Sequence, residues 1–179
     1  MALQVDGVAE RSLDGIINAL RTARLNAGIS QNALAEGLPV RGRAVSEWET
    51  GAIQPPLKNL ILWSGELDRR LVLVEQDQEL RSVRQRPGET WETFVRRQLA
   101  WPLKGRRKAW GISQAELGER VGVSRDSIQR WELARVPPRP IALIVWAQML
   151  GCRLALWPVT VPRIPGPRPE PVPISVLKY

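Results

Sequence analysis

The stretch that decides the fold of this chain is Gly111-Ile-Ser-Gln-Ala-Glu-Leu-Gly-Glu-Arg-Val-Gly-Val-Ser-Arg-Asp-Ser-Ile-Gln-Arg-Trp-Glu132. Ser113 and Glu116 have the spacing of a capping box, which predicts that a helix begins there. Gly122 provides a tight turn, because glycine enters positive φ without a steric penalty. Ser124 can cap a second helix directly after that turn. The stretch therefore predicts two short helices joined by a glycine turn.

The second of these helices has two different faces. Ile128 and Trp131 are three residues apart and would form its buried stripe. The polar residues of its outer face are Arg125, Asp126, Gln129 and Arg130. A short helix with hydrogen-bonding side chains on its outer face is suited to the major groove of DNA.

The same pattern occurs a second time, 83 positions upstream. Residues 28–49 read GISQNALAEGLPVRGRAVSEWE, and 9 of 22 positions match residues 111–132 without a gap. The matches in this copy are Gly28, Ile29, Ser30, Gln31, Leu34, Glu36, Val40, Trp48 and Glu49. The register continues on both sides, so the chain contains two copies of one unit.

The net charge of +8 is unevenly distributed along the chain. Residues 1–83 have 9 Lys/Arg against 11 Asp/Glu, a net charge of −2, whereas residues 84–179 have 17 against 7, a net charge of +10. Such a concentration of positive charge favours an anionic partner, nucleic acid before membrane.

Other functions are disfavoured by residues that the sequence lacks. It has no histidine, which removes the usual general base and most metal sites, and the single Cys152 cannot form an intrachain disulfide. No apolar run approaches the roughly 20 residues of a membrane span, and residues 1–16 lack the pattern of a secretory signal. We therefore expect a cytoplasmic, nucleoid-associated protein that is not an enzyme and binds neither cofactor, metal nor membrane.

These motifs resemble the helix-turn-helix domain of the lambdoid phage repressor and Cro family, also called the xenobiotic-response-element family. The resemblance covers roughly residues 13–70 and 102–152. It implies an all-α fold of two tandem five-helix-type helix-turn-helix domains, each followed by a short β-strand. It also implies that double-stranded DNA is bound by recognition helices near residues 41–49 and 124–132.

The family resemblance implies roles for individual side chains. Ser113 and Gln114 would bind phosphates at a helix N-terminus, and Arg107 with Glu132 would form a structural ion pair. The residues expected to face base edges in the second copy are Ser124, Arg125, Asp126, Gln129 and Arg130. Their counterparts for DNA contact in the first copy are Gln31, Arg41, Arg43 and Glu47.

The first copy departs from this pattern. Ala33 breaks the capping box, and Pro39 replaces the turn glycine, so we expect a different local turn. Arg41 replaces the capping serine, and Gly42 lies inside the recognition helix at a cost of about 1 kcal/mol against alanine. Glu47 would repel phosphate. We therefore expect the second copy to carry most of the DNA affinity.

Composition and periodicity divide the chain into four segments. The first domain is expected at 12–75, a polar linker at 76–90, the second domain with a preceding linker helix at 91–157, and a Pro-rich tail at 158–179. The remaining helices are predicted at 13–26, 57–68, 102–109 and 140–150. The β-like runs 71–75 and 153–157 are marginal alone, so we expect them to pair with each other or across chains.

The sequence favours a DNA-binding transcriptional regulator, a repressor, that acts as an intramolecular pseudo-dimer or as a homodimer. One alternative is an antitoxin-type autoregulator whose Pro-rich tail binds a toxin or another protein. A second alternative is an adaptor that uses this fold for protein contacts. Four tryptophans at the repeat offset, Trp48, Trp63, Trp131 and Trp146, are expected in the cores.

Overall fold

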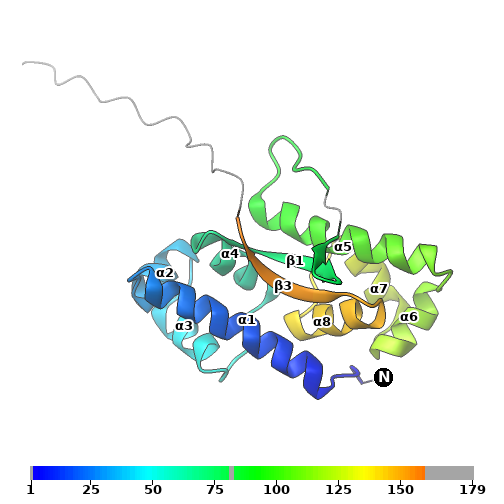
Figure 1. The fold of residues 1–179 in the computed structure, drawn as a ribbon, viewed down its shortest axis with the longest axis horizontal. Helices are drawn as coiled ribbons and strands as arrows, with labels where there is room; N and C mark the ends of the chain where they lie inside the picture. The colour runs from blue at the N-terminus through cyan, green and yellow to red at the C-terminus, as the bar shows by residue number, and fades with distance from the viewer. Residues whose placement is uncertain (1, 81–82, 160–179) are drawn as a thin grey trace, which may run out of the picture.

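The computed structural model describes residues 2–80 and 83–159, so nearly all of the Pro-rich segment at 158–179 lies outside the described residues. Within them the chain forms eight helices and three strands (Figure 1). The first repeat contains α1 (Gly7–Asn26), α2 (Gln31–Gly37), α3 (Gly42–Glu49), α4 (Leu57–Glu66) and β1 (Arg69–Glu75). After β2 (Gln78–Glu79), the second contains α5 (Trp91–Ala109), α6 (Gln114–Val121), α7 (Arg125–Glu132), α8 (Pro140–Met149) and β3 (Arg153–Pro158).

Each repeat therefore has four helices in the described part of the chain, not the five that we expected. The residues after α4 and α8 form the strands β1 and β3, with side chains alternating between the two faces of the sheet, so they do not form a fifth helix.

The first helix of each repeat is longer than predicted. α1 begins at Gly7, because the Asp6 carboxylate accepts a hydrogen bond from the Ala9 N–H at 2.7 Å. Residues 7–12, which precede the helix predicted at 13–26, therefore belong to α1. In the second repeat the expected linker helix and first helix are one continuous element, α5, with Pro102 inside it. Burial of Leu99 and Leu103 on either side of the proline holds the helix together.

A three-stranded antiparallel sheet with the order β2-β1-β3 joins the repeats. This confirms that the two β-like runs pair with each other, within one chain. Val72 pairs with Ala155, and these two residues occupy the same position in the two repeats. The flanking pairs are Leu71 with Leu156 and Leu73 with Leu154. The strands are thus related by a local two-fold axis through the central pair.

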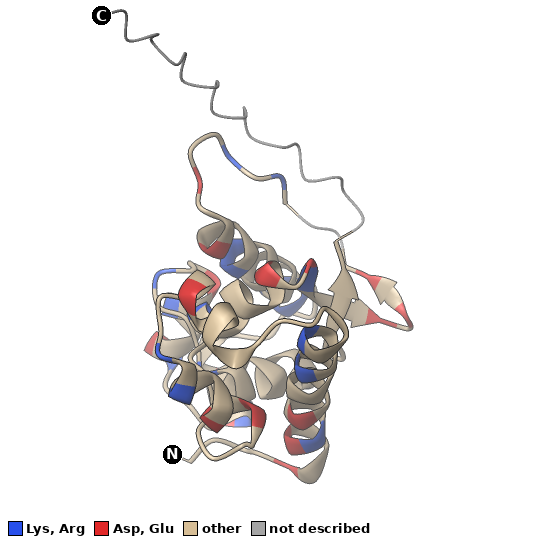
Figure 2. Ribbon diagram, turned by 90° about the vertical axis from the view of Figure 1, so that its left-hand side faces the viewer, with Lys and Arg blue, Asp and Glu red and all other residues tan. Residues whose placement is uncertain are grey.

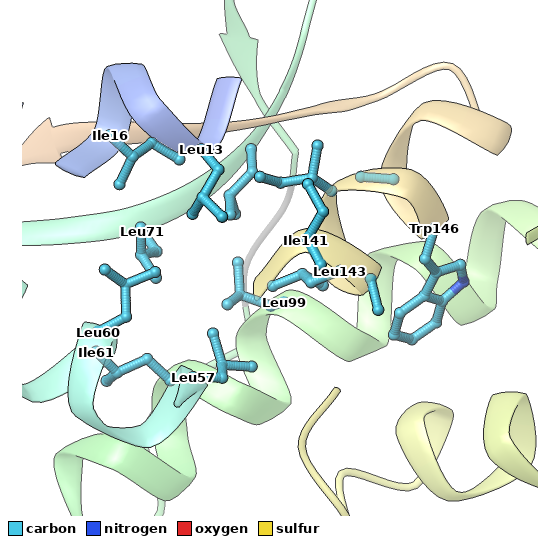
Figure 3. Packing of buried hydrophobic residues seen from close by; sticks show 14 of the residues in the cluster. Leu13, Ile16, Leu57, Leu60, Ile61, Leu71, Leu99, Ile141, Leu143 and Trp146 are labelled. Carbon is cyan, nitrogen blue, oxygen red and sulfur yellow. The ribbon is translucent and has the colours of Figure 1, made fainter. Parts of the chain in front are cut away.

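The two repeats share one hydrophobic core. α1 of the first repeat packs on α8 of the second, and α5 packs in return on α4 and β1. Figure 3 shows side chains of this cluster from both repeats, including Leu13, Ile16, Leu57, Leu60, Ile61, Leu71, Leu99, Ile141, Leu143 and Trp146. Burial of these apolar side chains holds the two repeats together as one packed body, because each Å² of apolar surface removed from water contributes roughly 25 cal/mol of stabilising free energy.

The tryptophans divide as their repeat positions indicate. The indole rings of Trp48 and Trp63 lie 5.9 Å apart in the core, and those of Trp131 and Trp146 lie 5.7 Å apart, as predicted. Among the tryptophans without a repeat partner, those with exposed rings are Trp101 and Trp110. No helix in the described residues is long and apolar enough to cross a membrane.

Candidate nucleic-acid interface

The α2–α3 and α6–α7 pairs lie toward opposite ends of the long axis of the molecule, with the sheet between them (Figure 1). In α6, the Ser113 hydroxyl accepts a hydrogen bond from the Glu116 N–H at 3.0 Å. The Glu116 carboxylate binds Arg120 at 2.6 Å, so only the serine half of the predicted capping box forms. Gly122 ends the helix at φ 84°, as predicted.

The N-terminal residues of the chain lie against this turn. The Gln4 N–H donates to the Val121 carbonyl at 2.9 Å. A Cβ atom at Gly122 would lie 2.0 Å from the Ala2 carbonyl oxygen and 2.9 Å from the Leu3 Cα. Gly122 therefore serves two purposes, because it allows a left-handed turn and a close approach of the first repeat to the second helix-turn-helix pair.

α7 presents the face that the sequence predicts. Ile128 and Trp131 are buried, and the Ser124 hydroxyl caps the helix by accepting from the Ser127 N–H at 3.1 Å. The candidate base-contacting residues on solvent-exposed positions are Ser124, Arg125, Asp126, Gln129 and Arg130. The arrangement places two guanidinium groups and an amide on one short exposed helix, where they could donate to base edges.

A buried ion pair ties α5 to the end of α7. Arg107 donates to Glu132 at 2.5 and 3.0 Å and to the Ile112 carbonyl at 2.7 Å. Gln114 also donates to Glu132, at 2.8 Å. The structural role expected for Arg107 and Glu132 is confirmed. One amide N–H of Gln114 is engaged within the protein, and its contact with phosphate stays a prediction.

The first repeat contains the same network. Arg24 donates to Glu49 at 2.6 and 2.8 Å and to the Ile29 carbonyl at 2.7 Å, and Gln31 donates to Glu49 at 2.8 Å. Burial opposes ionisation of Glu49, but hydrogen bonds from Arg24 and Gln31 outweigh it and lower the pKa of this carboxylate. In each repeat this network joins the first helix to the buried glutamate at the end of the recognition helix, and so helps to fix the orientation of that helix.

The turn of the first repeat differs locally from that of the second, as expected, because α2 ends at Gly37 with Leu38 as its cap, whereas α6 continues one equivalent residue further, to Val121. Pro39 lies at φ 26°, in the region that Gly122 occupies in the second repeat. The Val40 N–H donates to the Ala35 carbonyl at 3.2 Å, as the equivalent Val123 N–H does to Gly118. Pro39 has no N–H, so the hydrogen bond from the Gly122 N–H to the Gly118 carbonyl has no counterpart in the first repeat, and Pro39 is held at a φ far from the −65° that its ring favours.

The outer face of α3 differs from that of α7. Arg41 and Arg43 are exposed, and Arg41 provides no side-chain cap for the helix. Arg43 donates to Glu47 at 2.8 Å, so two predicted DNA-contacting residues bind each other. A Cβ at Gly42 would lie 1.9 Å from the Asn32 amide oxygen, so a larger residue at this position would require the Asn32 side chain to move.

The basic residues of α5 separate into two groups. Arg106 binds Glu75, the Leu150 carbonyl and the Cys152 sulfur, and its guanidinium lies over the Trp110 ring, 5.5 Å from the ring centroid. It therefore belongs to the contact between the repeats. Lys104 is half-buried and Lys108 is exposed.

Two further arginines, which were not among the predicted DNA-contacting residues, flank the loop after α7. Arg135 and Arg139 are both exposed, whereas the equivalent residues of the first repeat are Ala52 and Pro56. The difference was visible in the repeat alignment, although charge alone does not show which side of a loop faces DNA. Figure 2 shows positions of Lys and Arg interspersed with positions of Asp and Glu along the helices.

Comparison with known proteins agrees with this geometry. The family model described as Helix-turn-helix matches the chain twice, at residues 20–74 and 103–157. No curated protein and no solved structure matches the chain. The two matches together cover more than half of the sequence, and the family's domain binds DNA and regulates transcription. The chain therefore belongs to the Cro/C1-type helix-turn-helix family and contains two tandem copies of its domain.

Proposed function

We propose that this protein is a repressor that reads two unlike half-sites of one operator with the two recognition helices of a single chain. The observation that carries the proposal is the local two-fold axis between β1 and β3, which relates two helix-turn-helix units within one packed body. Two-fold related recognition helices suit half-sites about one helical turn apart. Because α3 and α7 differ in sequence, the preferred operator is not a palindrome.

The second unit contributes most of the affinity in this proposal. Arg125 or Arg130 contacts guanine O6 and N7, which supplies about 1–3 kcal/mol of base discrimination. On α3, Glu47 both repels phosphate and engages Arg43. The first unit therefore adjusts specificity more than affinity. The protein would act on cytoplasmic, nucleoid DNA, and a phage or mobile-element origin fits the family resemblance.

Selection of bound sequences from random DNA, followed by a salt titration, tests this proposal. We expect an enriched asymmetric motif and an affinity that falls steeply with salt. Arg125→Ala should relax one base position, and the matched Arg43→Ala should affect the other half of the motif less. Arg21→Ala, an exposed change on α1, is the control that should leave the motif unchanged.

Uniform weak binding with no enriched motif would refute the repressor proposal. An enriched palindrome bound by two chains would contradict the single-chain assignment instead. Repression itself is tested by placing the selected operator upstream of a reporter, where an increase in expression would identify an activator.

A further inference from the structure

The outer edge of β3 is free of a strand partner in residues 2–80 and 83–159. The sheet order β2-β1-β3 means that β2 covers the outer edge of β1, while β3 ends the sheet on the other side. The local two-fold axis through Val72 and Ala155 relates these two edges. The position of β2 beside β1 therefore has a vacant equivalent beside β3.

A groove lies next to this vacant position. It runs between α1 and β3, has a volume of about 350 Å³, and is lined by residues that include Ala19, Ala23 and Leu156. The counterpart of Ala23 in the second repeat is Arg106, which fills the corresponding cleft between α5 and β1 and binds Glu75. The groove is thus open because a small side chain replaces a large one.

The backbone of β3 is oriented to accept another strand. The Val159 N–H donates to the Asp68 carbonyl at 2.9 Å, which fixes the alternation of hydrogen-bonded pairs between β3 and β1. By that alternation the N–H and C=O of Leu156 point away from β1. Leu73 is its equivalent on β1, and the Leu73 carbonyl accepts from the Leu80 N–H at 2.9 Å beside β2.

The charged residues at this edge indicate which side chains a strand bound there would carry. On β1, Arg70 binds Glu79 through two hydrogen bonds of 2.5 and 2.6 Å. Arg153 is the counterpart of Arg70, its side chain is 56% exposed, and its ion pair is with Asp77 of the hairpin, whose side chain is 88% exposed. Arg69 adds a second positive charge to the groove. These positive charges favour a bound strand that carries a carboxylate, and they disfavour the β3 strand of a second copy of the chain, which itself carries Arg153.

We propose that the free edge of β3 binds an extended strand of a partner protein by β-augmentation. The hairpin specifies the pattern, because Glu79 lies opposite Val74 and is followed by Leu80. The partner strand therefore places an acidic residue opposite Trp157, where it pairs with Arg153, and then an apolar residue opposite Leu156. Main-chain hydrogen bonds supply affinity, and the acidic and apolar side chains supply specificity. This surface is distinct from the recognition helices and goes beyond DNA binding.

The chain provides its own probe for this site. The capped peptide Gln-Asp-Gln-Glu-Leu-Arg, the sequence of residues 76–81, is titrated into the full chain while backbone amide NMR signals are followed. We expect saturable shifts at Leu154 and Leu156. Replacing the peptide glutamate by lysine should weaken binding at least about tenfold, a factor equivalent to 1.4 kcal/mol. Arg153→Glu should restore binding of that lysine peptide.

Groove filling gives an independent test. Ala23→Arg copies the residue of the second repeat and should abolish peptide binding, while Thr22→Arg one position earlier should have a smaller effect. Unchanged amide spectra away from the groove would show that both variants fold. The proposal is overturned if shifts are absent at peptide concentrations of about 5 mM, a limit set by weak millimolar binding, or if they map elsewhere.

Two other occupants give distinguishable results, and either would overturn the proposal. If residues 160–179 cover the edge, the Leu156 amide exchanges slowly with solvent at every protein concentration without peptide. If a second copy of the chain covers it, protection of Leu156 increases with protein concentration and sedimentation shows a dimer.

Discussion

The two repeats have the same scaffold and different outer faces. The Arg–Glu–Gln network behind the recognition helix is the same in both, whether formed around Glu49 or around Glu132. On the outer side, Pro39 stands in place of Gly122, and Glu47 in place of Arg130. The buried polar contacts are thus the same in the two repeats, whereas the solvent-facing residues differ. A common fold therefore does not imply an equal capacity for DNA binding.

The largest effect is expected from breaking the feature that both repeats share. Glu132→Gln and Glu49→Gln each leave a buried arginine without its counter-charge, so each should lower the free energy of unfolding by about 3–5 kcal/mol. Urea unfolding measures this loss. Glu119→Gln, on an exposed position of α6, should change stability by less than about 0.5 kcal/mol. If only one of these two variants lost stability, the network would not have the same structural role in both repeats.

Gly122→Ala is expected to have the next largest effect. Its φ of 84° strains any L residue, and its Cβ would meet the Ala2 carbonyl, so we expect destabilisation by about 2–4 kcal/mol. Gly28→Ala is the matched control, because its φ is 68° but no atom lies within 4 Å of the new Cβ. If both variants unfold at the same urea concentration, the contact with the N-terminal residues contributes nothing.

Pro39→Gly should stabilise the first repeat. It relieves a strained φ at a cost of about 0.4–1 kcal/mol in chain entropy, and we expect a net gain of about 1 kcal/mol. Thermal unfolding measures the gain. Pro56→Gly, at φ −59° before α4, lacks such strain and should be destabilising. A loss of stability in Pro39→Gly would show that the turn is not strained.

Glu47→Gln should have the smallest effect on stability and a visible one on DNA binding. Its ion pair with Arg43 is solvent-exposed, so the free energy of unfolding should change by less than about 1 kcal/mol. Release of Arg43 toward phosphate should steepen the dependence of log affinity on log salt by about 1. Fluorescence anisotropy with the selected operator measures this slope, and an unchanged slope would place α3 away from the DNA backbone.

Local signals predicted the second helix-turn-helix pair because its caps and turn lie within a few residues of one another. Ser113, Gly122 and Ser124 have the predicted conformations or contacts. The pairing of β1 with β3 was predicted for a different reason, since two isolated strands need a partner. The order β2-β1-β3 was not predicted, because a two-residue strand such as β2 has no visible alternation.

The errors arose where distant contacts override local preferences. Pro102 was taken as a helix start, although α5 passes through it with buried leucines on both sides. The structural role of Arg106 could not be predicted, because its partner Glu75 is 31 positions away in the sequence. The roles of the candidate base-contacting residues stay predictions.

The antiparallel pairing of β1 with β3 also has a consequence for dosage. A regulator that assembles from two separate chains occupies its operator in proportion to the square of its concentration when the chains are dilute. Here the equivalent halves are already covalently joined and paired at Val72 and Ala155. Under the proposed function, in which one chain reads the whole operator, occupancy follows the first power of the protein concentration, so the response to gene copy number is graded and needs no threshold for assembly.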